Sequence, residues 1–375
     1  MRNYTLPIKV FDFFSGCGGT SRGFQDAGLE TVFAIDNDVN AANTFVRNFP
    51  GTQLVEGTSL PISHPSTSFL LHDINEIATD ILQPLIDELE GFPLLFSGCA
   101  PCQPFSKQKT QLPVDDPRKT LLSQFQRFVE QYKPEFVFIE NVPGMQKVQG
   151  KEGPFDDFVT TLHKLKYKVN FDIISAQHYG IPQKRRRLVL IASRLGQINF
   201  PQKTHGPGTL NPKYATPQQW MDDFPLIEAG ETHSTVRNHQ AMNLSELNLR
   251  RIKATPIGGD RRDWPDELVL KCHSNGYKGH TDVYGRIKWN ELSSCLTTKC
   301  TSLSNGRFGH PEQNRAISAR EAACLQTFPR DFIFEGGISL VAKQIGNAVP
   351  VLLAQRFGEN FNSHLKDYLE GKLNG

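Results

Sequence analysis

The chain has 375 residues, with 41 Lys and Arg against 39 Asp and Glu and a formal net charge of +2. A charge this close to zero does not by itself indicate a nucleic-acid partner, so any such partner must be argued from local clusters. No apolar run approaches the ~18 residues needed to cross a bilayer, and Asp12 and Gly16 interrupt the apolar start. We therefore expect a cytoplasmic protein without a signal peptide, one large core and a smaller second lobe.

The first elements in chain order form a strand, a glycine-rich turn, a helix and a second strand. The run from Ile8 to Phe14 predicts a buried strand, and the glycine-rich residues 15–23 lead into a helix that ends near Ala27. The second strand, 31–35, ends at Asp36, about twenty residues after the first glycine, which is the adenosine-binding pattern of doubly wound sheets. The alternative is a tight strand-to-helix turn without a ligand.

Strands and helices then alternate as far as Phe200. Further strands are expected at 69–71, 94–96, 136–139, 170–175 and 188–192, and helices at 77–89, 121–132 and 155–165. This alternation predicts an α/β fold with a doubly wound, mostly parallel sheet. Prolines accumulate after Phe200, and an apolar stretch at 342–357 predicts a last helix. We therefore expect a large lobe at 1–200 plus 335–375 and a smaller, loop-rich lobe at 201–334.

A thiol follows the predicted strand at 94–96. Cys102 lies in a loop punctuated by glycine and proline, which is how a chain presents a nucleophile, and the strand at 136–139 ends at Glu140. The thiol and the acid could therefore meet over one substrate at the carboxyl ends of the strands. Alternatively, Cys99 and Cys102 have the spacing of a redox pair or half a zinc site. Because no second pair at matching spacing completes a zinc site, we expect no metal.

Positive charge gathers beside these elements. The densest cluster is 184–187, Lys-Arg-Arg-Arg, and smaller ones lie at 250–253 and 261–262. Charge runs are usually solvated faces, but a position in loops beside the chemistry favours a functional role.

Five motifs occur in one order: Asp-Phe-Phe-Ser-Gly-Cys-Gly-Gly at 12–19, Pro-Cys-Gln at 101–103, Glu-Asn-Val at 140–142, Gln-Lys-Arg-Arg-Arg at 183–187 and Gln-Ile-Gly-Asn at 344–347. Together they resemble the DNA (cytosine-5)-methyltransferase family over nearly the whole chain. The resemblance implies a fold of the S-adenosylmethionine-dependent methyltransferase type and methyl transfer to C5 of a flipped-out cytosine in duplex DNA. The stretch from Gly206 to Ser294 would correspond to the target-recognition region.

The resemblance also implies roles for individual residues. Cys102 would be the nucleophile that adds to cytosine C6, Glu140 would act at N3, Arg187 would touch O2 and Arg185 would orient the loop. The expected cofactor, S-adenosyl-L-methionine, would be bound by Phe14, Gly16, Gly18, Gly19, Asp36, Asp73, Ile74 and Asn347. The expected DNA contacts are Gln103, Ser106, Gln183, Arg186, Arg261 and Arg262.

Two positions depart from the common family pattern. Asn37 stands where an aromatic residue often stacks on adenine, so that packing would fall to Phe14 or Ile74, and Lys119 stands where glycine is common. Neither change touches the groups that would carry the chemistry.

The expected partner is double-stranded DNA, and we expect a monomer in bacterial cytoplasm or nucleoid, with a companion restriction endonuclease acting separately. Three rival interpretations are an NAD-dependent oxidoreductase using the glycine turn and the cysteine pair, a catalytically silent DNA-binding relative, and a tRNA-methylating enzyme of similar fold. The first leaves the arginine-rich motif unexplained. The second is disfavoured because all the motif residues are present, and the long recognition stretch favours DNA over tRNA.

Overall fold

The computed structural model describes residues 4–57, 60, 67–100, 121–145, 153–271, 279 and 282–372. Contacts divide the chain into two compact units. Unit 1 comprises residues 1–175, 186–202 and 351–375, and unit 2 comprises residues 176–185 and 203–350. Within the described residues, every helix is too short or too polar to span a bilayer.

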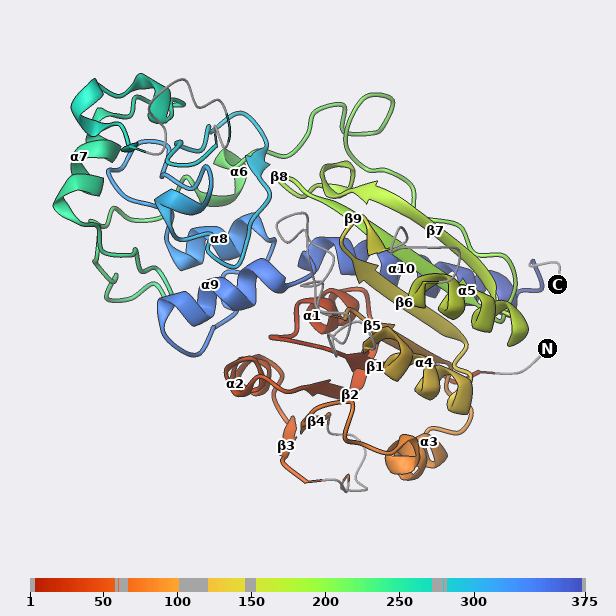
Figure 1. Cartoon of the computed structure of the whole chain (residues 1–375). Helices are drawn as coiled ribbons and strands as arrows, with labels where there is room; N and C mark the ends of the chain where they lie inside the picture. The colour runs from red at the N-terminus through yellow and green to blue at the C-terminus, as the bar shows by residue number, and fades with distance from the viewer. Residues whose placement is uncertain are drawn as a thin grey trace. The chain divides into compact units, whose positions relative to one another are not determined.

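Unit 1 is built on an eight-stranded sheet in the order β3-β4-β2-β1-β5-β6-β9-β7 (Figure 1). The strands are β1 (Lys9–Phe13), β2 (Glu30–Asp36), β3 (Gln53–Val55), β4 (Ser68–Leu71), β5 (Leu94–Gly98), β6 (Phe136–Asn141), β7 (Lys168–Ser175) and β9 (Arg186–Ser193). Only β9 runs against its neighbours, since it pairs antiparallel with both β6 and β7. The predicted doubly wound, mostly parallel sheet is thus confirmed.

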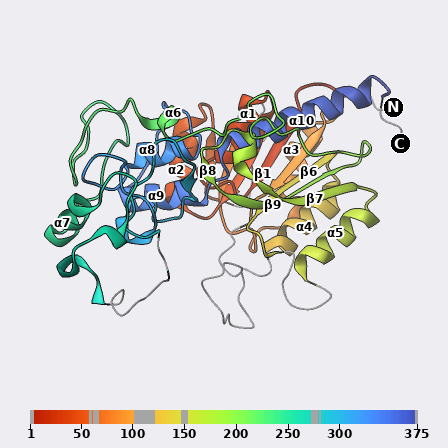
Figure 2. The same ribbon diagram turned by 90° about the horizontal axis from the view of Figure 1, so that it is seen from above.

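Helices cover both faces of this sheet. They are α1 (Gly19–Asp26), α2 (Val39–Asn48), α3 (Gln83–Glu88), α4 (Leu121–Tyr132), α5 (Pro154–Lys164) and α10 (Val351–Leu369). Helices α1 and α10 lie over one face, and α4 and α5 lie over the other (Figure 2). Because side chains alternate along a strand, Phe13 of β1 packs on Phe125 and Phe128 of α4. Phe138 of β6 points the other way and meets Phe24 of α1.

The chain order of the strands reverses between β1 and β5. Strands β2 to β4 lie on one side of β1, and β5 and β6 lie on the other. In open α/β sheets, ligands bind beyond the carboxyl ends of the strands at such a switch point. The turn after β1 and the chain after β5 are therefore the places to look for a site.

Unit 2 has little regular structure. It contains β8 (Gln183–Lys184), paired in parallel with β10 (Ser293–Ser294), and the helices α6 (Gln218–Met221), α7 (Glu246–Ala254), α8 (Ala319–Leu325) and α9 (Ile338–Asn347). Buried arginines hold its loops together by donating to backbone carbonyls. Arg286, for example, donates to the carbonyl oxygens of Thr255, Ile252, His310 and Gln313.

Candidate active site

The turn between β1 and α1 takes a backbone path that few residues adopt. Phe14, Gly16 and Gly18 all have positive φ, at 58°, 53° and 92°. A Cβ added to Gly18 would lie 2.5 Å from the Phe49 ring, whereas one added to Gly16 would meet nothing within 4 Å. Gly18 is therefore required for packing, and Gly16 borders open space into which a ligand could approach the backbone.

Asp36 ends β2 beside this turn. Its Oδ2 accepts the Gly16 N–H at 2.9 Å, and its Oδ1 accepts the Asp38 N–H at 2.9 Å. Burial raises the pKa of Asp36, and the two backbone donors oppose that rise. Since each carboxylate oxygen can accept two hydrogen bonds, both retain capacity for hydroxyl donors. The open space at Gly16 and this carboxylate fit an adenosine ribose.

The other cofactor candidates divide between the units. Phe14, Gly16, Gly18 and Gly19 line the β1–α1 turn, while Asp73 and Ile74 follow β4, the neighbour of β2. The Asp73 carboxylate accepts from the backbone N–H and the side-chain amide of Asn75, and Ile74 is buried in the core. Asn347 is the last residue of α9 and belongs to unit 2. Asn37, in the position where an aromatic residue is common, follows Asp36 directly.

Glu140 lies near the end of β6, and its side chain is 6% exposed. Its Oε1 is 2.9 Å from Nε of Arg187, whose strand β9 pairs with β6. The sequence placed these two residues forty-seven positions apart, and the antiparallel pairing brings them together. The two atoms are in ion-pair contact but not in hydrogen-bond geometry, and Oε1 has no hydrogen-bond partner among the described residues.

Asn141 connects the end of β6 to the chain after β5. Its side-chain amide donates to the Ala100 carbonyl at 3.1 Å, and its Oδ1 accepts the Val142 N–H at 2.8 Å. Ala100 is two residues before Cys102. Cys102, Gln103, Ser106 and Lys119 lie outside the described residues. The neighbouring Cys99 is described, and burial, with Glu140 and Asp12 nearby, raises the pKa of its thiol well above the usual value.

No role was predicted for Asp12 from the sequence, yet it is the most deeply buried carboxyl group beside this site. Its Oδ2 accepts the Ser21 hydroxyl at 2.6 Å. Burial raises its pKa from 3.8 to about 6. The signal in the sequence was an acid within an otherwise apolar strand, since Asp12 stands between Phe11 and Phe13.

Gln183 and Arg185 are buried in unit 2, where they join several elements. The Gln183 amide donates to Leu325 O and to Oε1 of Gln326, and its Oε1 accepts the Leu296 N–H. The Arg185 guanidinium donates to the carbonyl oxygens of Leu296, Gly346 and Ala348. The motif at 183–187 therefore crosses from unit 2 into unit 1, and Arg187 alone of the three meets Glu140.

The remaining candidates for DNA contact differ in exposure. Arg186 is exposed. Arg261 is buried and donates to Gly279 O at 2.7 Å. Arg262 is exposed, but its guanidinium bonds both oxygens of Asp260. Asp260 also accepts from Arg307, and the bonds from Arg262 and Arg307 hold its pKa well below the usual value. These bonds hold both arginines within the unit 2 loops.

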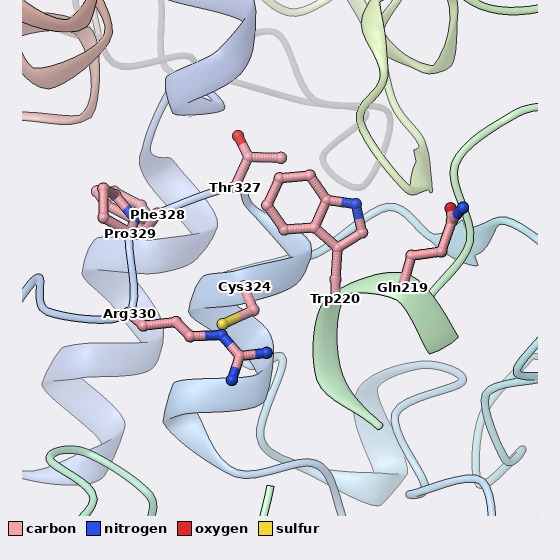
Figure 3. A pocket seen from close by; sticks show the side chains of 7 residues that line it. All are labelled: Gln219, Trp220, Cys324, Thr327, Phe328, Pro329 and Arg330. Carbon is pink, nitrogen blue, oxygen red and sulfur yellow. The ribbon is translucent and has the colours of Figure 1, made fainter. Parts of the chain in front are cut away.

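Unit 2 also contains a cavity of about 340 Å³ between α6 and the end of α8. Figure 3 shows the Trp220 indole beside Thr327, with Arg330 near Cys324. Arg330 is bonded through two nitrogens to Asp223 and lies 4.7 Å from the centre of the Phe224 ring. Because its charge is already neutralised, we assign this cavity no part in the chemistry. Within the described ranges, no cluster of three or more His, Cys, Asp or Glu side chains could hold a metal ion.

Comparison with known proteins agrees with this geometry. A family model described as C-5 cytosine-specific DNA methylase matches residues 8–363. The Type II methylase M.HgiDII of Herpetosiphon aurantiacus is 35% identical over 96% of this chain and 96% of its own length. The Type II methyltransferase M1.HphI of Haemophilus parahaemolyticus is 32% identical over 95% of this chain and 87% of its own. A solved chain from an E. coli prophage, described as a DNA modification methyltransferase, superposes with a TM-score of 0.70 at 22% identity and covers 96% of this chain and 100% of its own.

Proposed function

This chain belongs to the C-5 cytosine-specific DNA methylase family and is a DNA (cytosine-5)-methyltransferase, and we propose that it works through a covalent bond between Cys102 and cytosine C6. The observation that carries the proposal is the Glu140–Arg187 pair at the end of β6. Asn141 links that strand end to Ala100, two residues before the thiol.

Cytosine C5 is a weak nucleophile, and the proposed residues change that. The Cys102 thiolate adds to C6, the C5=C6 electron pair moves to form C4=C5, and the C4=N3 pair takes the proton of the Glu140 carboxyl group, in its acid form, at N3. As C5 forms its bond to the methyl group, the bond between that methyl group and the donor sulfur would break, and the sulfur would leave as a neutral thioether. Loss of the C5 proton to a base re-forms C5=C6 and expels the thiolate, and N3 returns its proton to Glu140. Arg187 keeps the Glu140 carboxyl group aimed at one place throughout.

The fold is that of S-adenosylmethionine-dependent methyltransferases, and we propose that S-adenosylmethionine binds at the β1–α1 turn. The cofactor supplies an electrophilic methyl group on a sulfonium. Asp36 would accept the ribose hydroxyls, because its two oxygens stand at the strand end beside the open side of Gly16. Ile74 and Phe14 would supply apolar surface for adenine, with Asp73 near its amino group.

The substrate atoms are inaccessible inside a stacked duplex, so the target cytosine must be flipped out. We propose that residues 206–294 select the sequence and that Arg186 contacts phosphate. The two Type II relatives also support a role in restriction-modification, with a separate endonuclease as companion.

The experiment that tests this function identifies the product. Plasmid DNA and tRNA are incubated separately with the purified protein and S-adenosylmethionine, digested to nucleosides and analysed by mass spectrometry, and the DNA is sequenced after bisulfite treatment. We expect 5-methylcytosine in DNA at one recurrent sequence. Methylation of tRNA in preference to DNA, or of a cytosine position other than C5, would contradict the proposal.

A further inference from the structure

The arginine-rich motif belongs to a longer stretch that lacks acidic residues. Residues 173–221 contain seven Lys or Arg and no Asp or Glu. With 39 acids in 375 residues, a stretch of this length would hold about five at the chain's average frequency. Five of the seven cations, Lys184, Arg186, Arg194, Lys203 and Lys213, are exposed, and no acid within the stretch competes with a polyanion for them.

A compact loop, residues 203–213, projects from this stretch in unit 2. Its ends are joined by backbone bonds from Asn211 N to Thr204 O and from Gly206 N to Asn211 O. The Thr209 hydroxyl lies within bonding distance of the carbonyl oxygens of Thr204, Gly206 and Asn211. This network holds the loop in one conformation before any partner arrives.

The base of the loop is fastened to the segment that leads into the arginine-rich motif. The backbone N–H groups of Thr204 and His205 both donate to His178 O, and the Tyr214 ring packs edge-on against the His178 ring. His178 is five residues before Gln183. The loop and the start of the motif therefore form one local assembly within unit 2.

The tip of the loop is a leucine with almost no protein contact. Leu210 is 98% exposed, more than any other large hydrophobic residue described. Lys203 and Lys213, both exposed, flank the loop. A fixed loop that presents an apolar side chain to water between two cations has the features of a DNA-contacting element, since lysines pair with phosphates and apolar side chains contact base edges or enter between base steps.

We propose that Leu210 is an apolar DNA contact, inserted against the bases while Lys203 and Lys213 hold the flanking phosphates. The proposal rests on duplex DNA as the substrate and adds a positioning residue for it. Leu210 does no chemistry. It helps to hold the duplex during base extrusion, so its removal should weaken DNA binding and leave turnover at saturating DNA unchanged.

The test compares Leu210→Ala with Leu6→Ala, a control outside residues 206–294 whose side chain is 59% exposed. Each variant's Kd is measured for a duplex that the wild-type protein methylates, with S-adenosylhomocysteine present, together with KM for DNA, kcat and the urea unfolding midpoint. We expect Leu210→Ala to raise Kd and KM roughly ten- to a hundredfold, from the burial of one leucine side chain. Its kcat and unfolding midpoint should not change, Leu6→Ala should match the wild type, and Leu210→Met should keep most of the affinity.

The lysines give a second readout. Lys203→Gln and Lys213→Gln should each reduce the slope of log Kd against log salt by about 0.9, whereas Leu210→Ala should leave that slope unchanged. An unchanged Kd for Leu210→Ala would overturn the proposal, and so would a lowered unfolding midpoint, because the side chain would then serve the fold. Both results concern the Leu210→Ala variant, whereas the proposed function is tested by methylation of DNA by the wild type. Either result would therefore leave the proposed function unaffected.

Discussion

The Glu140–Arg187 pair joins a buried acid and a half-buried arginine, one on each of two adjacent strands of unit 1. Their side chains are 6% and 13% exposed, so little water would reach the carboxylate if the guanidinium were removed. A buried charge that loses its partner costs several kcal/mol.

We expect Arg187→Ala to destabilise the protein by about 3 kcal/mol and to lower kcat by on the order of a hundredfold, since the acid loses its orientation. Urea unfolding and single-turnover methylation measure the two effects. The double variant Arg187→Ala with Glu140→Gln should recover more than 1 kcal/mol of the stability that the single variant loses. Strict additivity of the two single changes would show that the ion pair contributes nothing.

Asp12 makes stability depend on pH. Its pKa rises from 3.8 to about 6 on folding, so between these values the native state holds a proton that the unfolded state has released. Its contribution is fully present below pH 3.8 and is lost as pH rises through about 6. Relative to Asp12→Asn, the wild type should therefore lose roughly 2.5 kcal/mol of stability between pH 4 and pH 7.

Urea titrations of both proteins across this range measure that difference. The Ser21 hydroxyl is a donor that lowers the Asp12 pKa, so Ser21→Ala should raise that pKa further. In this variant the loss of stability with rising pH should therefore continue to higher pH. A stability difference between wild type and Asp12→Asn that stays constant from pH 4 to pH 7 would rule out a raised pKa.

At the scale of elements, α1 and α10 pack closely enough that only glycine fits between them. A Cβ added to Gly23 would lie 2.3 Å from Val351 O and 2.6 Å from the Ala354 Cβ. Gly23→Ala should therefore cost about 3 kcal/mol of unfolding free energy, the upper part of the range for overpacking. Gly57→Ala is the control, because its added Cβ would meet nothing within 4 Å. Equal stability of the two variants would contradict this packing.

The sequence predicted the strands of the central sheet because their apolar runs are short and bounded by turn residues. It was less successful where a local signal was weak. The predicted helix at 77–89 is a 3₁₀ turn, Thr79–Leu82, followed by the short α3, which has Pro84 in its first turn. The edge strand β3 (Gln53–Val55) was missed because its three side chains are largely exposed and carry no apolar alternation.

The candidate site shows the same limit. Asp36 and Glu140 could be chosen from the sequence because each follows an apolar run at a strand end. The hydrogen bonds from Gln183 and Arg185 to α8, α9 and the β10 segment could not be predicted, because they join residues more than a hundred positions apart. Pairing across such distances depends on the folded packing, which local periodicity does not encode.

At the scale of the whole molecule, the groups proposed for chemistry and for sequence choice lie in different parts of the chain. Asp36, Glu140 and Arg187 belong to unit 1, and residues 206–294 belong to unit 2. Replacing 206–294 with the matching stretch of a relative of different specificity should change the methylated sequence and leave the product as 5-methylcytosine. The replacement stretch should keep a serine at position 293, because the Ser293 hydroxyl donates to Pro182 O. Bisulfite sequencing reads the result, and an active chimera that kept the original target would contradict this division.

The most direct test of the central claim uses duplex DNA with 5-fluorocytosine at the target position. A base can remove a proton from C5, but it cannot remove fluorine as a cation. Once Cys102 is bonded to C6 and C5 is methylated, the adduct therefore has no route to elimination. With S-adenosylmethionine present, we predict that the wild-type protein forms an adduct resistant to denaturation, which peptide mass spectrometry maps to Cys102. Cys102→Ser should form none, and Glu140→Gln should form it more slowly. An enzyme that methylates ordinary DNA yet forms no such adduct, or forms it through another residue, would contradict the mechanism.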